Sequence, residues 1–235
     1  MKKIFLLLFF LCLVSIGFSQ KAVVQQMSKG DIDNIFTTGI NNQFSIDFPI
    51  WKAFRVSDNT GLYFIALTEK SSSITSNGDT LHDAIKAFCL QQQKDSLIKK
   101  WVITDFVQKD PMQGFVESSI WFWTKYTSFD DIDGDGVADP IVIYGTNGQN
   151  GYDDGRIKFI IYFKNKKIAI RHQNGVLDDE RQTQVDATFY TLPLSIQQAV
   201  QKKMKLMVAN GHAIFPYGWE KAMTKKKTFF SERNE

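Results

Sequence analysis

The segment from Asp131 to Asp139 constrains the fold and the function of this chain more than any other. It reads Asp-Ile-Asp-Gly-Asp-Gly-Val-Ala-Asp, with carboxylates at relative positions 1, 3, 5 and 9 and glycine at position 6. Calcium loops use this order of ligands, because a sharply turning backbone aims alternate side chains at one point. Asp131, Asp133 and Asp135 are therefore predicted to supply three oxygen ligands to one calcium ion.

The second half of the loop is predicted to complete the ligand set. Gly136 lets the backbone turn back on itself, the carbonyl oxygen of Val137 is the predicted fourth ligand, and Asp139 is the fifth, directly or through water. A solvated acidic turn is the alternative, since Asp and Gly are ordinary turn formers. The metal site is favoured because close carboxylates would repel one another without a cation.

The residues that follow the loop separate it from an EF-hand. Val142 stands where an EF-hand carries its bidentate glutamate, and Asp139 runs through Pro140 into an apolar segment. The loop instead resembles the Asp-Gly calcium loops of FG-GAP and VCBS-type β-repeats. Those families repeat the loop in blade after blade, whereas one copy occurs here, so the sequence does not support a propeller.

Residues 1–19 are predicted to be a secretory signal peptide. Two lysines precede an apolar run from Ile4 to Val14, and small residues precede a cut near Gln20. Cys12 follows Leu11, which is not the small residue that a lipidation motif requires. Residues 20–235 are predicted to form a single exported domain, periplasmic, on the outer surface or secreted, without a transmembrane span.

Charge and cysteine content limit the classes of partner and of stabilisation. Loss of Lys2 and Lys3 leaves 26 basic residues (28 − 2) against 25 acidic ones. This balance provides no basic footprint for nucleic acid. Cys89 is the only cysteine after residue 19, so no internal disulfide can form. The fold must then depend on its core and on the ion, and the sequence leaves the oligomeric state open.

The predicted fold class is α+β, a mainly antiparallel sheet of hairpins and a meander with C-terminal helices packed on it. Apolar and alternating runs predict the strands, and Ser71–Asp79 is predicted to be a polar loop. The predicted strands cover residues 44–48, 61–68, 84–90, 101–107, 120–126 and 140–144, followed by a hairpin over 156–172 that turns at 164–166. Asn174-Gly175 predicts one more two-residue hairpin turn.

The 120–126 strand is apolar on both faces, which predicts a central strand covered on both sides. Its tryptophans, Trp121 and Trp123, are predicted to point one way. Its other large residues, Ile120, Phe122 and Tyr126, are predicted to point the other way. Exposed tryptophan pairs can stack on sugar rings. Core packing is favoured, because aromatic residues with apolar neighbours are usually buried.

The end of the chain, about 195–228, is predicted to be helical. Ser195 and Gln198 fit a capping box, and Asn210-Gly211 is predicted to end the first helix. An apolar stripe along that helix comprises Ile196, Val200, Met204 and Met207. This stripe predicts packing of the helix on the sheet.

The segment 145–156 is a second candidate ligand loop, rich in glycine and in side-chain oxygens. Its candidate residues are Asn147, Asn150, Tyr152, Asp153, Asp154 and Arg156. It offers acids and no lysine, which excludes a phosphate loop. Ligands to the same ion, a second site, a sugar pocket and plain turns all remain open.

Catalysis has weak candidates only. His172 lies near Asp178 and Asp179 in the sequence, and Asp154 could join them as a further carboxylate. No nucleophile elbow or paired zinc-ligand motif accompanies them. A histidine beside a hairpin turn is more often a surface or hydrogen-bonded residue. The sequence therefore favours a protein that is not an enzyme.

Several segments resemble a family of small secreted bacterial proteins usually labelled "surface polysaccharide biosynthesis protein". They are Ile120–Tyr126, Asp139–Ile141, Tyr144–Thr146, Asn150–Tyr152, Asp154–Lys158, Ile170–Gly175 and Ala213–Trp219. The resemblance covers most of residues 20–235. It implies a cell-envelope role and an association with glycans, and it supplies no catalytic residues.

Three functions follow from these observations. The first is an exported calcium-binding envelope or surface protein, not an enzyme, associated with surface polysaccharide. The second is a glycan-active hydrolase that uses His172 and loop carboxylates. The third is a periplasmic assembly factor that binds a protein partner.

Overall fold

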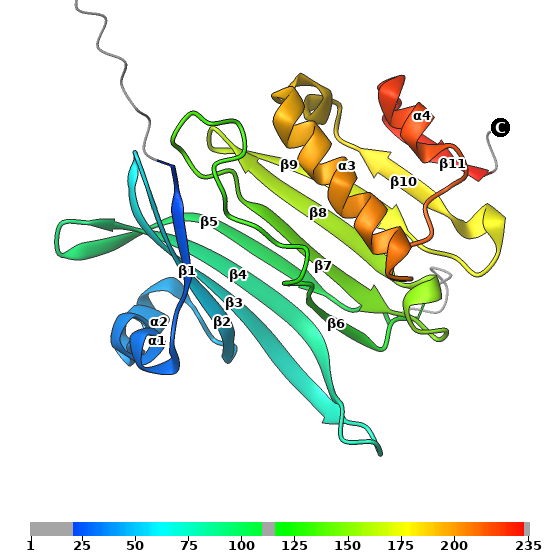
Figure 1. Cartoon of the computed structure of the whole chain (residues 1–235). Helices are drawn as coiled ribbons and strands as arrows, with labels where there is room; N and C mark the ends of the chain where they lie inside the picture. The colour runs from blue at the N-terminus through cyan, green and yellow to red at the C-terminus, as the bar shows by residue number, and fades with distance from the viewer. Residues whose placement is uncertain (1–20, 110–115, 233–235) are drawn as a thin grey trace, which may run out of the picture.

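The computed structural model describes residues 21–109 and 116–232 (Figure 1). The predicted signal peptide, residues 1–19, lies outside the described residues, as does Cys12. Two antiparallel sheets form most of the described chain, and a few helices cover them. The predicted α+β class with mainly antiparallel sheet is confirmed.

Each sheet comes from a continuous part of the chain. The first sheet has five strands in the order β1-β2-β3-β4-β5, a simple meander. Its strands are β1 (Val23–Gln26), β2 (Ile50–Asp58), β3 (Gly61–Ile74), β4 (Thr80–Gln93) and β5 (Ser96–Phe106). The second has six strands in the order β11-β10-β9-β8-β7-β6. Its strands are β6 (Ser119–Phe122), β7 (Ile141–Asn147), β8 (Arg156–Phe163), β9 (Lys166–Gln173), β10 (Gln182–Val185) and β11 (Phe229–Ser231).

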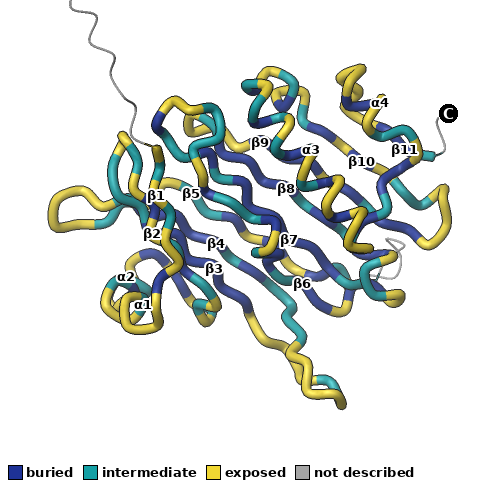
Figure 2. Tube along the Cα trace, viewed as in Figure 1, coloured by how far each residue is buried: buried dark blue, intermediate teal, exposed yellow. Residues whose placement is uncertain are grey.

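The two sheets pack face to face, and helices cover their outer faces (Figure 1). On the first sheet lie the helices α1 (Lys29–Ile35) and α2 (Thr38–Phe44), and on the second lie α3 (Leu194–Ala209) and α4 (Trp219–Thr224). The chain therefore forms four layers in the order helices, sheet, sheet, helices. Figure 2 shows that burial is concentrated in the middle of both sheets.

Strand alternation explains why both faces of each sheet are apolar. In β3, Ile65 faces the inter-sheet core, whereas Phe64 packs with α1 and α2. In β8, Ile160 faces the inter-sheet core, whereas Phe159 packs under α3. Because successive side chains point to opposite faces, a sheet that is covered twice needs continuous apolar runs.

The C-terminal helix confirms its predicted apolar stripe. The buried residues of α3 are Ile196, Val200, Met204 and Met207. The predicted capping box is wrong, because Pro193 is the N-cap residue and no side chain caps the helix. Asn210 ends α3 as predicted, and Gly211 follows with φ of 70°.

Two predictions in the first half of the chain are wrong. The predicted strand 44–48 is instead the last residue of α2, Phe44, and the turn after it, where Ser45 adopts a left-handed conformation. Capping of α2 outweighs the alternation of apolar and polar residues over 44–48, because the Thr37 hydroxyl accepts the Ile40 N–H at the start of the helix. The predicted loop 71–79 begins too early, since β3 runs to Ile74 and pairs with β4, and residues 75–79 alone form the loop before Thr80.

Two predictions in the second half also need correction. The strand predicted over 120–126 ends at Phe122, and it is an edge strand that pairs only with β7 among the described strands. Both tryptophans lie on one side, as predicted, but Tyr126 joins them there because the chain turns after Trp123. The Asn174-Gly175 pair does not close a two-residue hairpin. The connection from β9 to β10 takes residues 174–181 instead.

One buried carboxyl lies between the sheets. Glu69 of β3 is 5% exposed, and its Oε1 accepts the Phe122 N–H at 3.0 Å. The His82 Nε2 lies 3.7 Å from its Oε2. Burial raises the pKa of Glu69 to about 7, against the opposing effects of the Phe122 N–H and the Lys52 charge. Glu69 is therefore held partly protonated near neutral pH.

Glu69→Gln should remove a pH dependence of stability. Burial penalises the ionised form of Glu69 in the folded protein. The wild type is therefore most stable below the unfolded pKa of 4.5, where Glu69 is protonated in both states, and it loses stability as pH rises to about 7. We expect the unfolding free energy of the variant, minus that of the wild type, to rise by about 2–3 kcal/mol from pH 5 to pH 8. Urea denaturation measures this difference.

The same comparison is made in a His82→Gln background, because His82 lies 3.7 Å from Glu69 and the two titrations are coupled. The control is Glu220→Gln, because Glu220 is exposed and pairs only at the surface with Lys205. If the difference in unfolding free energy between Glu69→Gln and the wild type stayed constant from pH 5 to pH 8, the raised pKa of Glu69 would be contradicted.

Candidate metal centre

The Asp131–Asp139 loop connects the first two strands of the second sheet. It follows β6 and the turn after it, and it ends two residues before β7 begins at Ile141. Gly134 and Gly136 have φ values of 82° and 84°, in a left-handed region that residues with a Cβ rarely adopt. These glycines allow the tight coil that the spacing predicts.

Three of the four aspartates converge. Ligand oxygens of Asp131, Asp133 and Asp139 all lie within 4.8 Å of one another. Asp139 is the anchor of the group, being only 3% exposed, whereas the other two are half-buried. Carboxylate oxygens at this spacing suit a hard divalent cation.

Backbone N–H groups of the loop hold the carboxylates in place. Asp139 Oδ2 accepts the Ile132 N–H at 2.9 Å. Asp131 accepts the N–H of Gly134 at 2.7 Å with one oxygen and that of Gly136 at 3.0 Å with the other. The backbone of the loop is thus wrapped around its own carboxylates by these hydrogen bonds alone.

Asp135 does not join the converging group. It is exposed, and its Oδ1 accepts the N–H of Val137 at 2.9 Å. The structure therefore brings together Asp131, Asp133 and Asp139 from the predicted ligands. The side chain of Asp135 instead stabilises the local turn that carries Val137.

The electrostatics of the loop favour a cation. Burial is the largest cause that raises the pKa of Asp139, to about 6, and the charges of Asp133 and Asp135 raise it further. The N–H groups of Ile132 and Asp133 lower the pKa only in part. A bound cation would supply the missing positive charge and would favour the ionised form.

The loop also contacts the first sheet through the β2–β3 turn. Asp58 Oδ2 accepts the Ala138 N–H at 3.0 Å, and the Asn59 N–H donates to the Gly136 carbonyl at 2.9 Å. The other oxygen of Asp58 accepts the Thr60 N–H at 2.7 Å and so fixes the turn itself. The candidate centre therefore lies at a junction between the two sheets.

In the sequence, Asp58 is recognisable only as part of an Asp-Asn-Thr-Gly turn. Its bond to Ala138 joins residues 80 positions apart, and no local pattern in the sequence signals such a contact. The Asp-Asn-Thr-Gly order predicts the turn correctly, but not that the turn supports the acidic loop.

The second candidate loop, 145–156, closes on itself. Asp154 Oδ2 accepts the backbone N–H of Asn150 at 2.9 Å and its side-chain Nδ2 at 3.2 Å. Gly148 and Gly151 pair across the turn, and a Cβ at Gly148 would meet the Asp154 carboxylate at 2.1 Å. Asp153 points to solvent. The contacts match a set of tight turns.

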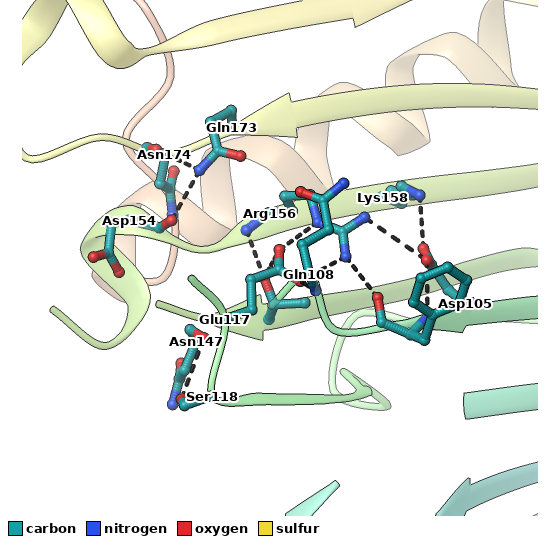
Figure 3. A network of polar contacts seen from close by, with 12 residues as sticks. Asp105, Gln108, Glu117, Ser118, Asn147, Asp154, Arg156, Lys158, Gln173 and Asn174 are labelled. Carbon is teal, nitrogen blue, oxygen red and sulfur yellow. Dashed lines mark hydrogen bonds and ion pairs between the residues drawn. The ribbon is translucent and has the colours of Figure 1, made fainter. Parts of the chain in front are cut away.

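The Tyr152 ring and the Asn147 backbone have partners inside the fold, whereas the buried Asn147 Oδ1 has no hydrogen-bond partner among the described residues. The Tyr152 ring stacks on His212 at 4.8 Å between centroids, and it meets the edge of Trp123. The Asn147 carbonyl accepts the Ser118 N–H at 2.8 Å (Figure 3). The Tyr152 ring is therefore part of an aromatic cluster between the loop and the C-terminal segment.

Arg156 belongs to a buried ionic network (Figure 3). Its guanidinium contacts both oxygens of Glu117, with Nη2 at 2.7 Å from Oε2. Glu117 also accepts from the Gln108 N–H at 2.7 Å and from the Thr146 hydroxyl at 2.9 Å. Burial alone would lower the pKa of Arg156, but its bond to Glu117 and the charge of Glu117 raise it.

Asp105 extends this network from β5 to β8. Its Oδ2 accepts from Lys158 Nζ at 2.6 Å, and its Oδ1 lies 3.7 Å from the Arg156 guanidinium. The segment that holds Glu117 and the strand β5 are thus both bonded to β8. Arg156 acts here as a structural cation between the sheets. Glu117 carries no recognisable motif, so the sequence did not predict this pair.

His172 is buried and hydrogen-bonded at both ring nitrogens. Its Nδ1 lies 2.9 Å from the Thr183 hydroxyl, and its Nε2 lies 2.7 Å from Asn174 Oδ1. Because an amide oxygen only accepts, Nε2 carries the proton and the Thr183 hydroxyl donates to Nδ1. Burial lowers the pKa of His172 to about 4, against smaller raising effects of Asn174 and the backbone. The ring is neutral at pH 7.

The other catalytic candidates lie elsewhere. Asp178 and Asp179 are exposed in the short helical turn 178–180, where Asp178 pairs with Arg181 at 2.5 Å. Asp154 is joined to the region of His172 only indirectly, since its carbonyl accepts the Gln173 side-chain amide at 2.8 Å. The ring nitrogens of His172 therefore have neutral partners and no carboxylate.

The two loops do not form one site. The acidic loop leads into the start of β7, whereas 145–156 follows its end, and His172 pairs with Ile157 at the start of β8. The acidic loop and His172 thus lie at opposite ends of the second sheet (Figure 1). The structure brings the 145–156 loop near His172 and leaves the aspartates of 131–139 apart.

Comparisons of the chain with protein families, with curated proteins and with solved structures found no match. Among residues 21–109 and 116–232, no helix is both long and apolar enough to cross a membrane. The site is therefore interpreted from its own geometry.

Glu117→Ala should destabilise the protein strongly, because it leaves the Arg156 guanidinium buried without its main partner. We expect a loss of about 3–5 kcal/mol in the free energy of unfolding, measured by urea denaturation. The double variant Glu117→Leu/Arg156→Met should recover most of this loss, since it removes both charges.

The matched control is Asp33→Ala, which breaks the exposed Lys29–Asp33 pair and should cost at most about 1 kcal/mol. A Glu117→Ala protein as stable as this control would show that the buried network does not hold Arg156 as described.

Proposed function

We propose that the protein is an exported calcium-binding module of the cell envelope that works at surface polysaccharide and is not an enzyme. The observation that carries the calcium part is the convergence of Asp131, Asp133 and Asp139 within 4.8 Å. The sequence spacing predicts these three carboxylates together with Asp135, and the fold brings the three together.

The donor set favours calcium over softer metals. The converging group contains carboxylates only, without histidine or cysteine from any described residue. Oxygen donors suit calcium and magnesium, and calcium tolerates the flexible, irregular ligand arrangement of a loop. Three side chains do not fill the coordination shell of calcium, and a backbone carbonyl and water would supply the remaining ligands.

The ion would have a structural effect at the junction of the sheets. Neutralising the loop carboxylates would stabilise its coil, and the coil is bonded to the β2–β3 turn through Asp58 and Asn59. The ion would thereby stabilise the arrangement of one sheet on the other. Exported modules bind calcium with Kd values of about 10⁻⁴–10⁻³ M, which suits such a constitutive role.

The envelope and polysaccharide parts rest on the sequence. The leader-like residues 1–19 support export, and the family resemblance supports a surface role. The hydrolase alternative is less well supported, because His172 is buried, neutral and bonded to Thr183 and Asn174. No observation favours the assembly-factor alternative over the first proposal.

Calcium should bind the purified protein, freed of metal with a chelator, at one site. We expect a Kd of about 10⁻⁴–10⁻³ M in calorimetry. At calcium about 100-fold above Kd, the unfolding free energy should rise by about 2.7 kcal/mol. Asp133→Asn should abolish both effects, since it removes a charged ligand.

The control for this experiment is Asp153→Asn, an exposed aspartate outside the converging group, which should bind calcium as the wild type does. Absence of heat and of any change in melting temperature with calcium would remove the metal site. Equal calcium affinity in Asp133→Asn would place the ion elsewhere.

Export predicts where the protein accumulates. A C-terminally tagged chain should appear in the periplasm, on the surface or in the medium, shortened by about 19 residues. Deletion of residues 2–19 should retain it in the cytoplasm. Mass spectrometry of the mature N-terminus checks this, and an uncut cytoplasmic full-length chain would refute the envelope proposal.

A further inference from the structure

A cavity of about 430 Å³ lies at the end of the inter-sheet core, beside the acidic loop. The first sheet contributes its inner-facing Val56, Ile65 and Cys89. The second sheet contributes Tyr162, and the chain from Val137 to Pro140 forms a further wall. A cavity of this size holds a small organic molecule. The proposed function of the acidic loop does not account for it.

The interior of the cavity is apolar. Trp101 of β5 and Tyr162 of β8 stack across the two sheets with centroids 4.4 Å apart and planes 9° apart. Burial raises the pKa of Cys89 to about 12, so its thiol stays protonated and behaves as an apolar group. The stacked faces of Trp101 and Tyr162 cover each other, which leaves the facing surfaces unavailable to a sugar ring.

The hydroxyl and amide groups on the rim are already bonded to one another. The Thr60 hydroxyl lies 2.7 Å from the Tyr63 hydroxyl, and the Gln91 side-chain amide donates to that same oxygen at 3.1 Å. The Gln91 amide also donates to the Thr60 carbonyl at 2.8 Å. Few of these polar atoms remain to pair with a ligand that carries many hydroxyls.

Two lysines provide the charge at the rim. Lys100 is the extra residue of a β-bulge between β4 and β5, and Lys164 lies in the β8–β9 turn with φ of 48°. Bulges re-aim side chains, and here the bulge places Lys100 in the wall of the cavity. Within residues 21–109 and 116–232, neither lysine forms a salt bridge.

The acids that also line the cavity are engaged with the backbone. Asp58, Asp135 and Asp139 accept N–H groups from Ala138, Val137 and Ile132, respectively. Neither lysine ammonium group has a carboxylate partner among the described residues, and that of Lys164 lies 5.0 Å from the centroid of the Phe163 ring. An apolar interior below two lysines that form no salt bridge is complementary to an amphipathic anion.

We propose that this cavity binds a small amphipathic anion, with its acyl or aryl body between the sheets and its carboxylate or equivalent group at Lys100 and Lys164. The ligand enters between the β2–β3 turn and the β8–β9 turn, which both line the cavity. This site adjoins the cation centre, because Asp135 and Asp139 of the acidic loop line the cavity, but its anion-binding groups are the two lysines.

The test uses two fluorescent probes that differ in charge, with chelator present so that the result does not depend on calcium. The anionic probe is 1-anilinonaphthalene-8-sulfonate, and the neutral probe is N-phenyl-1-naphthylamine, which has the same aromatic body without the sulfonate. The anionic probe should bind the purified protein saturably at one site, and decanoate should displace it.

Charge reversal tests the role of the lysines. Lys100→Glu/Lys164→Glu should lower the affinity for the anionic probe about tenfold, and the affinity for the neutral probe by less than about twofold. Lys99→Glu/Lys166→Glu is the matched control, since both lysines are exposed neighbours that do not line the cavity, and it should leave both probes unchanged.

A cavity-filling variant tests the position of the site. Cys89→Met extends the side chain into the cavity and should lower the affinity for both probes about equally. The melting temperature of every variant checks that it is folded. Loss of the anionic probe in the lysine variant alone is sufficient support if Cys89→Met does not fold. Displacement by maltose instead of decanoate, equal binding by the lysine variant and its control, or no saturable binding would each overturn the proposal.

Discussion

The layer between the two sheets is the interaction on which the rest of the structure depends. Side chains from β2 to β5 and from β6 to β9 form one apolar cluster there, and each sheet is then covered outside by its own pair of helices. Burial of this layer removes the inner face of both sheets from water at once, at about 25 cal/mol per Å² of apolar area. The inter-sheet layer thereby fixes how the N-terminal half of the chain is oriented on the C-terminal half.

Polar and charged groups surround this layer at its margins. Glu69 bonds the backbone of Phe122 near one margin, and the Glu117–Arg156 pair ties β8 to the segment that follows β5. At a third place, Asp58 holds the acidic loop. Each of these groups has a partner from the other sheet or from the connection between the sheets. Because a buried charge without a partner is costly, these pairs disfavour sliding of one sheet over the other.

The sequence predicts the elements whose signals are local and misses those set by contacts between distant residues. The β8–β9 hairpin and the α3 stripe follow from alternation and helical periodicity, and the structure confirms both. The 44–48 strand is wrong because Thr37 caps a helix that ends at Phe44, where alternation suggests a strand. Spacing predicts the three converging aspartates, and it also predicts Asp135, which does not converge with them. It cannot predict Asp58, whose contact depends on the packing of the sheets.

The continuous origin of each sheet affects the order in which this chain can fold. The first sheet is complete by Phe106, whereas its inner face is covered only after β6 to β9 have followed, at Gln173. A chain that leaves the ribosome or a translocation channel from its N-terminus therefore exposes a wide apolar surface for an interval of synthesis. During that interval the uncovered inner face of the five-stranded half favours self-association, which fast completion of the second half limits.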